Sequence, residues 1–205
     1  MANDTQAHNS QVEPLRWEGV AYRPLSYING LEPRTVEAIQ RVVIHATELP
    51  DLAMAREYGE RILYEGSQTG NSGHFYIDRD GTVEQWVPVE RIAHHVRGHN
   101  SDTIGIEIVN RGRYPNWLAT DAQRWADPYT EVQLRALIEL LQRLDETLPN
   151  LEAIVGHEDL DTEQVPASDD PEQSVPRKMD PGPLFPWARV IDESGLPFSA
   201  EFTQD

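Results

Sequence analysis

The chain has 205 residues, of which 39% are hydrophobic and 25% charged, as is ordinary for a soluble globular protein. Its 35 acidic and 17 basic residues give a net charge of −18, which argues against nucleic acid or anionic lipid as a partner, because both require positive protein surface. Cysteine is absent, so disulfides and thiolate ligands are excluded and any metal must be bound by His, Asp or Glu.

No apolar run is long enough to span a bilayer, and the first ten residues have neither the basic nor the apolar region of an export signal. The chain as written therefore indicates a cytoplasmic protein, whereas removal of a signal would place it in the periplasm or cell envelope. We leave the compartment open. Nothing in the sequence demands more than a monomer.

The N-terminal half begins with an irregular segment and continues with a strand and a helix. Residues 1–34 contain scattered Pro and Gly without a sustained period and predict an irregular arm. Residues 41–46 form an apolar run typical of a buried strand, with His45 at its C-terminal end. Residues 51–64 have apolar positions at helical spacing and predict a helix, which Gly59 weakens by about 1 kcal/mol relative to Ala.

A hairpin and a second strand follow. Two β-prone runs at 74–78 and 83–87 are joined by an Asp-Gly turn signal and predict a β-hairpin. Residues 103–109 alternate strictly: isoleucines line one face, and Glu107 projects from the other.

A long helix is predicted to begin at Thr130, which forms a capping-box pattern with Gln133. Its apolar stripe, at spacings of three and four, is Leu134, Leu137, Ile138, Leu141, Leu144 and Leu148. Pro149 ends the helix, and residues 152–157 return as a strand that ends at His157.

Strands that alternate with helices and a hairpin indicate the α/β fold class: a single domain with a central mixed β-sheet flanked by helices. We expect the domain at 35–192, the irregular arm at 1–34 and an acidic C-terminal tail at 193–205. Residues 158–176 contain seven acidic residues and no Lys or Arg, so we expect this segment and the tail to be solvated.

His45, His157 and Asp180 are candidate ligands of a catalytic zinc ion. Each histidine stands at the C-terminal end of a predicted strand, and Asp180 lies in a loop stiffened by Pro181 and Pro183. A lone strand-end histidine is more often a structural residue, and an Asp before Pro often starts a turn, so only the three residues together indicate a metal site. Catalytic zinc takes three protein ligands and keeps a fourth position for water. The set predicts a zinc hydrolase with one zinc ion.

Glu107 and Lys178 are candidate catalytic residues. A Glu in a strand is usually satisfied or exposed at an edge, but beside zinc it can accept a proton from the bound water. Lys178, otherwise an ordinary surface lysine, lies two residues before Asp180 and can stabilise the oxyanion of a tetrahedral intermediate.

Substrate contacts or support for the ligands are expected from His74, His95, Arg97 and Asn100. A rival metal site is the cluster His94, His95 and His99, but Gly98 argues against the helix that its spacing would require. The sequence contains no His-Glu-x-x-His, no Gly-x-Ser-x-Gly and no phosphate-binding glycine loop.

Six motifs occur between about residues 41 and 190. They are Val-Val-Ile-His-Ala-Thr at 42–47, Ser-Gly-His-Phe-Tyr-Ile-Asp-Arg-Asp-Gly at 72–81, Ala-His-His-Val at 93–96, Ile-Gly-Ile-Glu at 104–107, Gly-His at 156–157 and Arg-Lys-Met-Asp-Pro-Gly-Pro-Leu-Phe-Pro-Trp at 177–187. In this order they resemble the zinc-dependent N-acetylmuramoyl-L-alanine amidases, a family related to peptidoglycan recognition proteins and phage amidase endolysins. The resemblance implies cleavage of the amide between N-acetylmuramic acid and L-alanine, with peptidoglycan or its muropeptides as substrate.

The resemblance implies the same three ligands, the same catalytic carboxylate and the same oxyanion lysine. The chain departs from the family at three places. His94 replaces the Trp that precedes the histidine matched by His95, and Gly73 stands where phage members have a tyrosine. The segment between His157 and Asp180 is longer than usual, and its acidic insertion could be a lid, a specificity loop or a solvated bulge.

Two alternatives to an amidase stay open at this point. Relatives of this fold bind muropeptide without cleaving it, so a non-catalytic peptidoglycan-binding module is one; a zinc peptidase acting on a non-murein amide is the other. Presence of the whole ligand set with both catalytic candidates favours the enzyme over the binding module. The sequence does not distinguish intact wall from anhydro-muropeptides as the substrate.

Overall fold

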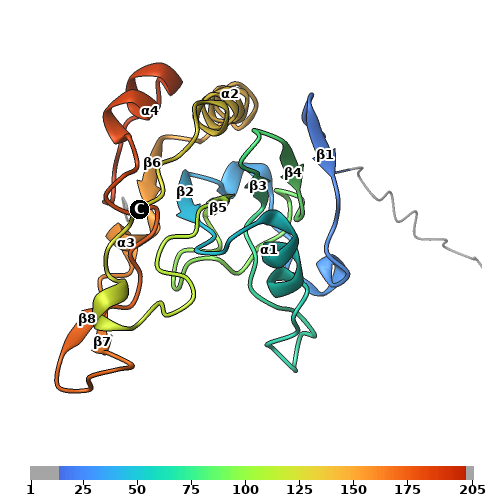
Figure 1. Cartoon of the computed structure of the whole chain (residues 1–205). Helices are drawn as coiled ribbons and strands as arrows, with labels where there is room; N and C mark the ends of the chain where they lie inside the picture. The colour runs from blue at the N-terminus through green and yellow to red at the C-terminus, as the bar shows by residue number, and fades with distance from the viewer. Residues whose placement is uncertain (1–13, 202–205) are drawn as a thin grey trace, which may run out of the picture.

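A six-stranded mixed β-sheet lies at the centre of the part of the chain that the structure describes, residues 14–201 (Figure 1). The structure is a computed structural model. Across the sheet the strands follow the order β1-β4-β3-β5-β2-β6. Their bounds are β1 Val20–Tyr22, β2 Arg41–Ala46, β3 Phe75–Ile77, β4 Val83–Gln85, β5 Thr103–Ile108 and β6 Ala153–Gly156. β3, β5, β2 and β6 are parallel, whereas β4 is antiparallel to β3 and parallel to β1, so the predicted mixed sheet is confirmed.

Helices cover both faces of the sheet. They are α1 Leu52–Gly59, α2 Glu131–Thr147, α3 His157–Leu160 and α4 Trp187–Ser194, with short 3-10 helices at Ile28–Gly30, Val36–Ala38 and Thr120–Ala122. α2 and α4 lie side by side on one face, and α1 lies on the other (Figure 1). None of the helices within residues 14–201 is long and apolar enough to cross a membrane.

The long helix α2 begins at the predicted capping box and packs on the isoleucine face of β5. Thr130 accepts a hydrogen bond from the Gln133 N–H at 3.2 Å, and the Gln133 side chain accepts one from the Thr130 N–H at 3.0 Å. The predicted stripe is buried over its whole length: Leu134, Leu137, Ile138, Leu141, Leu144 and Leu148. Each such side chain stabilises the fold by roughly 1.5–3 kcal/mol relative to an exposed one.

The parallel strands bring the candidate site residues to one edge of the sheet. β2 lies between β5 and β6, and all three run in the same direction. His45 is the register partner of Glu107 in β5, so the two side chains project from the same face of the sheet. β6 ends at Gly156, directly before His157. The site therefore forms at the C-terminal ends of the strands.

The expected irregular arm contains regular structure. Residues 20–22 form β1, which pairs with β4 at one edge of the sheet, and the side chains of Trp17, Leu25 and Leu31 are buried. The rest of the arm, residues 1–13, lies outside the described residues. The strand β1 was not predicted, because a three-residue edge strand has no period of its own and its pairing with β4 is a contact distant in sequence.

The predicted helix at 51–64 ends early. α1 begins after Asp51, whose side chain accepts a hydrogen bond from the Met54 N–H, but it stops at Gly59. The Tyr27 hydroxyl donates to the Gly59 carbonyl at 2.7 Å, and the Leu63 N–H donates to Thr69 instead of to a helical carbonyl. The prediction for residues 60–64 was wrong because these tertiary hydrogen bonds replace helical ones.

The acidic segment 158–176 is folded rather than loose. It contains most of α3 and the separate antiparallel hairpin formed by β7 Gln164–Pro166 and β8 Ser174–Pro176. Asp161 is only 7% exposed and pairs with Arg177, whereas the other six acidic side chains of the segment are at least partly exposed, as expected.

The expected acidic tail is also partly ordered. α4 extends to Ser194, beyond the expected domain end at 192, and Phe198 forms a parallel bridge with Ile154 of β6. Residues 202–205 lie outside the described part of the chain.

Candidate active site

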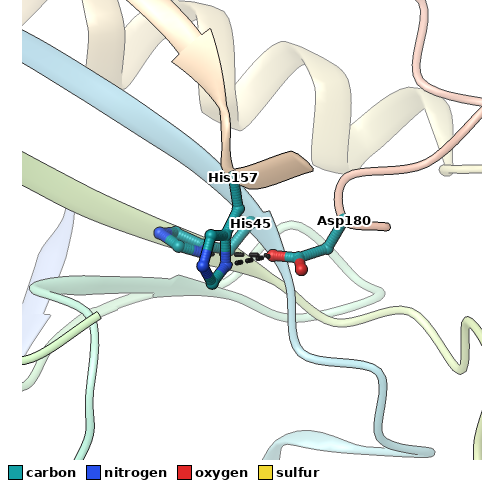
Figure 2. Close-up of side chains that lie close together, drawn as sticks. All are labelled: His45, His157 and Asp180. Atoms are coloured by element: carbon teal, nitrogen blue, oxygen red, sulfur yellow. Dashed lines mark hydrogen bonds and ion pairs between the residues drawn. The ribbon is translucent and has the colours of Figure 1, made fainter. Parts of the chain in front are cut away.

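Two histidines and one aspartate converge where the parallel strands end (Figure 2). His45 is the penultimate residue of β2, His157 begins α3, and Asp180 lies in the loop before α4. The Nδ1 atoms of His45 and His157 lie 3.0 and 3.1 Å from the same oxygen, Oδ2 of Asp180. One potential ligand atom from each residue lies within 4.8 Å of the others. The structure thus brings together the three residues that the sequence singles out as ligands.

The donor set and its burial fit a zinc ion. His45 is 1% exposed, and His157 and Asp180 are each 3% exposed. Oδ1 of Asp180 and Nε2 of His157 are buried and make no hydrogen bond with the described residues. Buried polar atoms normally have partners, and two imidazoles with one carboxylate are a common protein ligand set for zinc.

The protonation states of His45 and Asp180 suit metal binding. Burial and the neighbouring His157 lower the pKa of His45 to about 4, so its imidazole is neutral at pH 7. Burial alone would raise the pKa of Asp180, but His157 and His45 hydrogen-bond its carboxylate and hold the pKa well below its usual value. Neutral imidazole and ionised carboxylate are the forms that bind metals.

His95 supports His45 on the side away from Asp180. Nε2 of His45 lies 3.0 Å from Nδ1 of His95, and Nε2 of His95 lies 3.3 Å from Oγ1 of Thr103. The Thr103 hydroxyl donates to the His99 carbonyl, so its oxygen is free to accept from His95 Nε2–H. With a metal ion on Nδ1 of His45, His95 Nδ1 would accept from His45 Nε2–H, the kind of hydrogen bond that orients a metal-ligating imidazole.

Glu107 stands beside the ligand cluster. Its Oε1 atom lies 3.9 Å from Nδ1 of His45, and its side chain is 16% exposed. Burial and the negative charge of Asp180 raise the pKa of Glu107 to about 8. A cation bound by the cluster would act in the opposite direction and favour the carboxylate.

One pocket of about 850 Å³ contains the ligands, Glu107 and Lys178. Aromatic and polar side chains form its further walls, among them Tyr58, Tyr64, Asn71, His94, Trp117 and Arg177. The ring of His94, which stands where the resemblance leads us to expect Trp, packs edge-on against Tyr64 with centroids 5.0 Å apart. The pocket therefore keeps an aromatic wall at this position.

The four residues expected near the substrate have different environments. His95, Arg97 and Asn100 line the pocket, but His74 does not. His74 is fully buried: its Nδ1 accepts from the Gly105 N–H at 3.0 Å, and its Nε2 lies 3.0 Å from the Arg91 carbonyl. These contacts hold the backbone of β5 at Gly105 and the Arg91 carbonyl, and His74 is not among the residues that line the pocket.

The loop that carries His95 is fixed by its own side chains. Asn100 accepts hydrogen bonds from the backbone N–H groups of His95 and Val96 at 2.9 and 2.8 Å. Arg97 forms an exposed ion pair with Glu163 at 2.9 Å. Residues 94–99 are not helical. Within residues 14–201, His94, His95 and His99 do not form a group of three possible metal ligands, so the rival metal site is not formed.

A buried ion pair at the pocket, between Glu48 and Arg113, was not predicted from the sequence. Their exposed fractions are 6% and 2%, and the side chains are joined by two hydrogen bonds of 2.7 and 2.8 Å. Glu48 could have been noticed in the sequence, because it lies two residues after the end of the buried strand that contains His45. Arg113, 65 residues away, has no comparable feature in the sequence.

The fold and the ligand cluster define the class: an α/β domain with a candidate zinc hydrolase centre at the ends of parallel strands. The family model described as N-acetylmuramoyl-L-alanine amidase (Amidase_2) matches residues 35–183. The chain belongs to this N-acetylmuramoyl-L-alanine amidase family.

Individual relatives agree with this assignment. The chain is 32% identical over 120 residues to N-acetylmuramoyl-L-alanine amidase AmiD of Escherichia coli, covering 54% of this chain and 37% of that protein. It is 33% identical over 122 residues to 1,6-anhydro-N-acetylmuramyl-L-alanine amidase AmpD of Enterobacter cloacae, covering 55% and 51%. The matches thus span about half or less of these curated relatives.

A solved structure of E. coli AmiD in complex with a substrate superposes on 78% of this chain and 58% of that chain, with a TM-score of 0.57 and 23% identity. This similarity shows a shared fold.

Proposed function

We propose that the protein hydrolyses the amide bond between N-acetylmuramic acid and L-alanine, with one zinc ion held by His45, His157 and Asp180. The observation that carries the proposal is the convergence of this buried ligand set with Glu107 and Lys178 in one pocket. Membership of the amidase family supports the same reaction.

Zinc bound by these ligands would lower the pKa of a coordinated water toward about 7 and polarise the scissile carbonyl. Glu107 is placed to take the proton of the attacking water, because its carboxylate borders the ligand cluster and lines the pocket. The same carboxyl group can then return the proton to the leaving amine, which is a poor leaving group unless protonated.

Lys178 is assigned the stabilisation of the oxyanion. It lines the same pocket two residues before Asp180, and its charge acts on both Glu107 and Asp180 by lowering their pKa values. A cation aimed at the oxygen that becomes negative in the tetrahedral intermediate lowers the barrier selectively. Its ammonium group therefore serves the transition state more than the bound substrate.

The proposed substrate is a muropeptide or the corresponding unit of peptidoglycan. The AmiD complex contains anhydro-N-acetylmuramic acid-L-Ala-D-γ-Glu-L-Lys, and the AmpD relative is named for 1,6-anhydro-N-acetylmuramyl-L-alanine. A pocket of about 850 Å³ that remains open beside the ligands is large enough for a sugar and the first residues of a stem peptide.

The test is incubation of the zinc-loaded protein with purified muropeptides and, separately, with intact sacculi, followed by mass spectrometry of the products. The proposal expects a free stem peptide that begins with L-alanine. Binding without any product would support a peptidoglycan-binding module, and cleavage only within the peptide would support a zinc peptidase.

A further inference from the structure

A buried ion pair lies beside the pocket at a point where three chain segments meet. Nε and Nη2 of Arg113 donate to the two carboxylate oxygens of Glu48 at 2.7 and 2.8 Å, and the Arg113 backbone N–H donates to Glu48 Oε1 at 3.1 Å. Burial of two charges costs desolvation energy that their attraction offsets only in part, so such a pair is weak evidence for a role in stability. Its geometry indicates another role.

The guanidinium group of Arg113 also holds the segment that carries two of the proposed site residues. Its Nη1 donates to the Pro176 carbonyl at 2.8 Å, and its Nη2 donates to the Arg177 carbonyl at 3.3 Å. These are the two residues directly before Lys178, and Asp180 follows two positions later. One planar group with several donors in fixed directions thus joins Glu48 to the backbone of this segment.

Glu48, the residue that Arg113 joins to the 176–177 backbone, is itself held in place. It lies three residues after His45 and has a φ of +50°, an unfavourable conformation for a residue with a side chain. The Trp117 indole N–H donates to the Glu48 carbonyl at 3.0 Å. The surrounding structure therefore holds Glu48 in a conformation that the isolated chain would avoid.

The segment after β5 is adapted to this pair as well. Gly112 has a φ of +49°, and a Cβ atom there would lie 2.8 Å from Cγ of Glu48. Glycine is thus required both by the backbone conformation and by the close approach of the carboxylate chain. The Glu48 side chain occupies the space that a side chain at residue 112 would need.

We propose that the Glu48–Arg113 pair sets the position of Lys178 and Asp180 relative to His45 and Glu107. Glu48 is anchored after β2 and Arg113 after β5. The guanidinium group of Arg113, which is hydrogen-bonded to Glu48, fixes the backbone of residues 176 and 177 relative to these two strands. Both are positioning residues, since they act through the segment that they hold. The inference rests on the proposed zinc amidase function for its kinetic part, whereas its zinc-binding part stands independently.

Two single variants test the pair. Arg113→Lys keeps the charge but loses the planar fork, so it cannot hold Glu48 and both carbonyls at once. Glu48→Gln keeps the shape of the side chain and removes its charge. We expect zinc to bind each variant about 10- to 100-fold more weakly in a chelator competition, the usual effect of losing a group that orients metal ligands. With zinc in excess, kcat should fall while KM changes less than threefold.

A double variant separates positioning from stability. Glu48→Leu with Arg113→Met replaces the pair by apolar side chains, an exchange that often leaves stability unchanged or improves it. We expect an unchanged or higher melting temperature together with weaker zinc binding. The matched control is Arg189→Lys, which alters a surface ion pair between Arg189 of α4 and Glu131 of α2 and should change neither zinc affinity nor kcat.

Zinc affinity within twofold of the unaltered protein, with unchanged kcat, in folded Arg113→Lys and Glu48→Gln would overturn the proposal, whatever their melting temperatures. If the double variant does not fold, the single variants decide by the same criterion. A protein that binds zinc but cleaves no muropeptide would contradict the proposed function, and the zinc competition would still test the pair.

Discussion

A Cβ atom on Gly73 would lie 2.8 Å from Cγ of Glu107 and 3.1 Å from the Gly105 carbonyl oxygen. The His74 N–H donates to that same carbonyl at 2.8 Å, so the backbone cannot move away without losing the hydrogen bond. Glu107 therefore occupies space that a side chain at residue 73 would need. The tyrosine that phage members have at this position cannot be accommodated here while Glu107 stays in place.

Gly73→Ala should displace Glu107 and reduce kcat by about 10- to 100-fold, because small misplacements of a reacting group are costly. The measurement is turnover of a muropeptide at saturating concentration, with zinc content determined in parallel. Gly66→Ala is the matched control, since a Cβ there meets nothing within 4 Å. Equal turnover in the two variants would show that Glu107 tolerates the added methyl group.

Glu107→Gln should leave zinc bound while lowering kcat by roughly 10²- to 10⁴-fold, the range for loss of a general base. The amide keeps the shape of the carboxylate but cannot accept the water proton. Zinc content by atomic absorption and turnover by mass spectrometry measure the two effects separately. An unchanged rate would remove this carboxylate from the mechanism.

Asp180→Ala should reduce zinc occupancy, since it removes one of three protein ligands together with the carboxylate that both histidines face. Dialysis against a defined free zinc concentration, followed by metal analysis, gives the occupancy. Asp192→Ala removes an exposed carboxylate of α4 and serves as the control. Full zinc in the Asp180 variant would contradict the ligand assignment.

The buried His74 should make the metal-free protein sensitive to acid. Burial and the nearby charge of Arg34 hold the pKa of His74 well below 6.5, so the folded protein keeps it neutral while the unfolded chain binds a proton below about pH 6.5. Its contribution to stability is full above that pH and is lost as the pH falls. This one proton changes the free energy of unfolding by at most about 1.4 kcal/mol per pH unit.

Urea unfolding of the chelator-treated protein between pH 7 and 5 measures this effect. His74→Gln should have a smaller slope of unfolding free energy against pH than the unaltered protein, whatever its absolute stability. Because both proteins are metal-free, loss of zinc at low pH does not contribute. Parallel slopes in the two proteins would mean that His74 is protonated in the folded state.

Local sequence patterns predicted the helix and strand features that depend on contacts between residues close in sequence. Thr130 and Gln133 fixed the start of α2, and the alternation around Glu107 identified both the strand and the face from which this side chain projects. The ligands His45 and His157 could be placed at one edge because parallel strands end together.

The features that the sequence did not predict depend on contacts between residues distant in sequence. The end of α1 depends on the Tyr27 hydroxyl, 32 residues away, and β1 exists because it pairs with β4. Arg113 reaches Glu48 across 65 residues, and neither side chain belongs to a periodic pattern. Such pairings are properties of the folded chain, so composition and spacing did not predict them.

The strand that leads to His157 is paired on both of its sides. β2 lies on one side, and on the other the Ile154 N–H donates to the Pro197 carbonyl at 2.9 Å while the Ser199 N–H donates to the Ile154 carbonyl at 3.0 Å. A strand with free N–H and C=O groups is a template for association with another chain. Removal of residues 197–199 would therefore open β6 to strand addition, and self-association would begin at the strand that leads to His157.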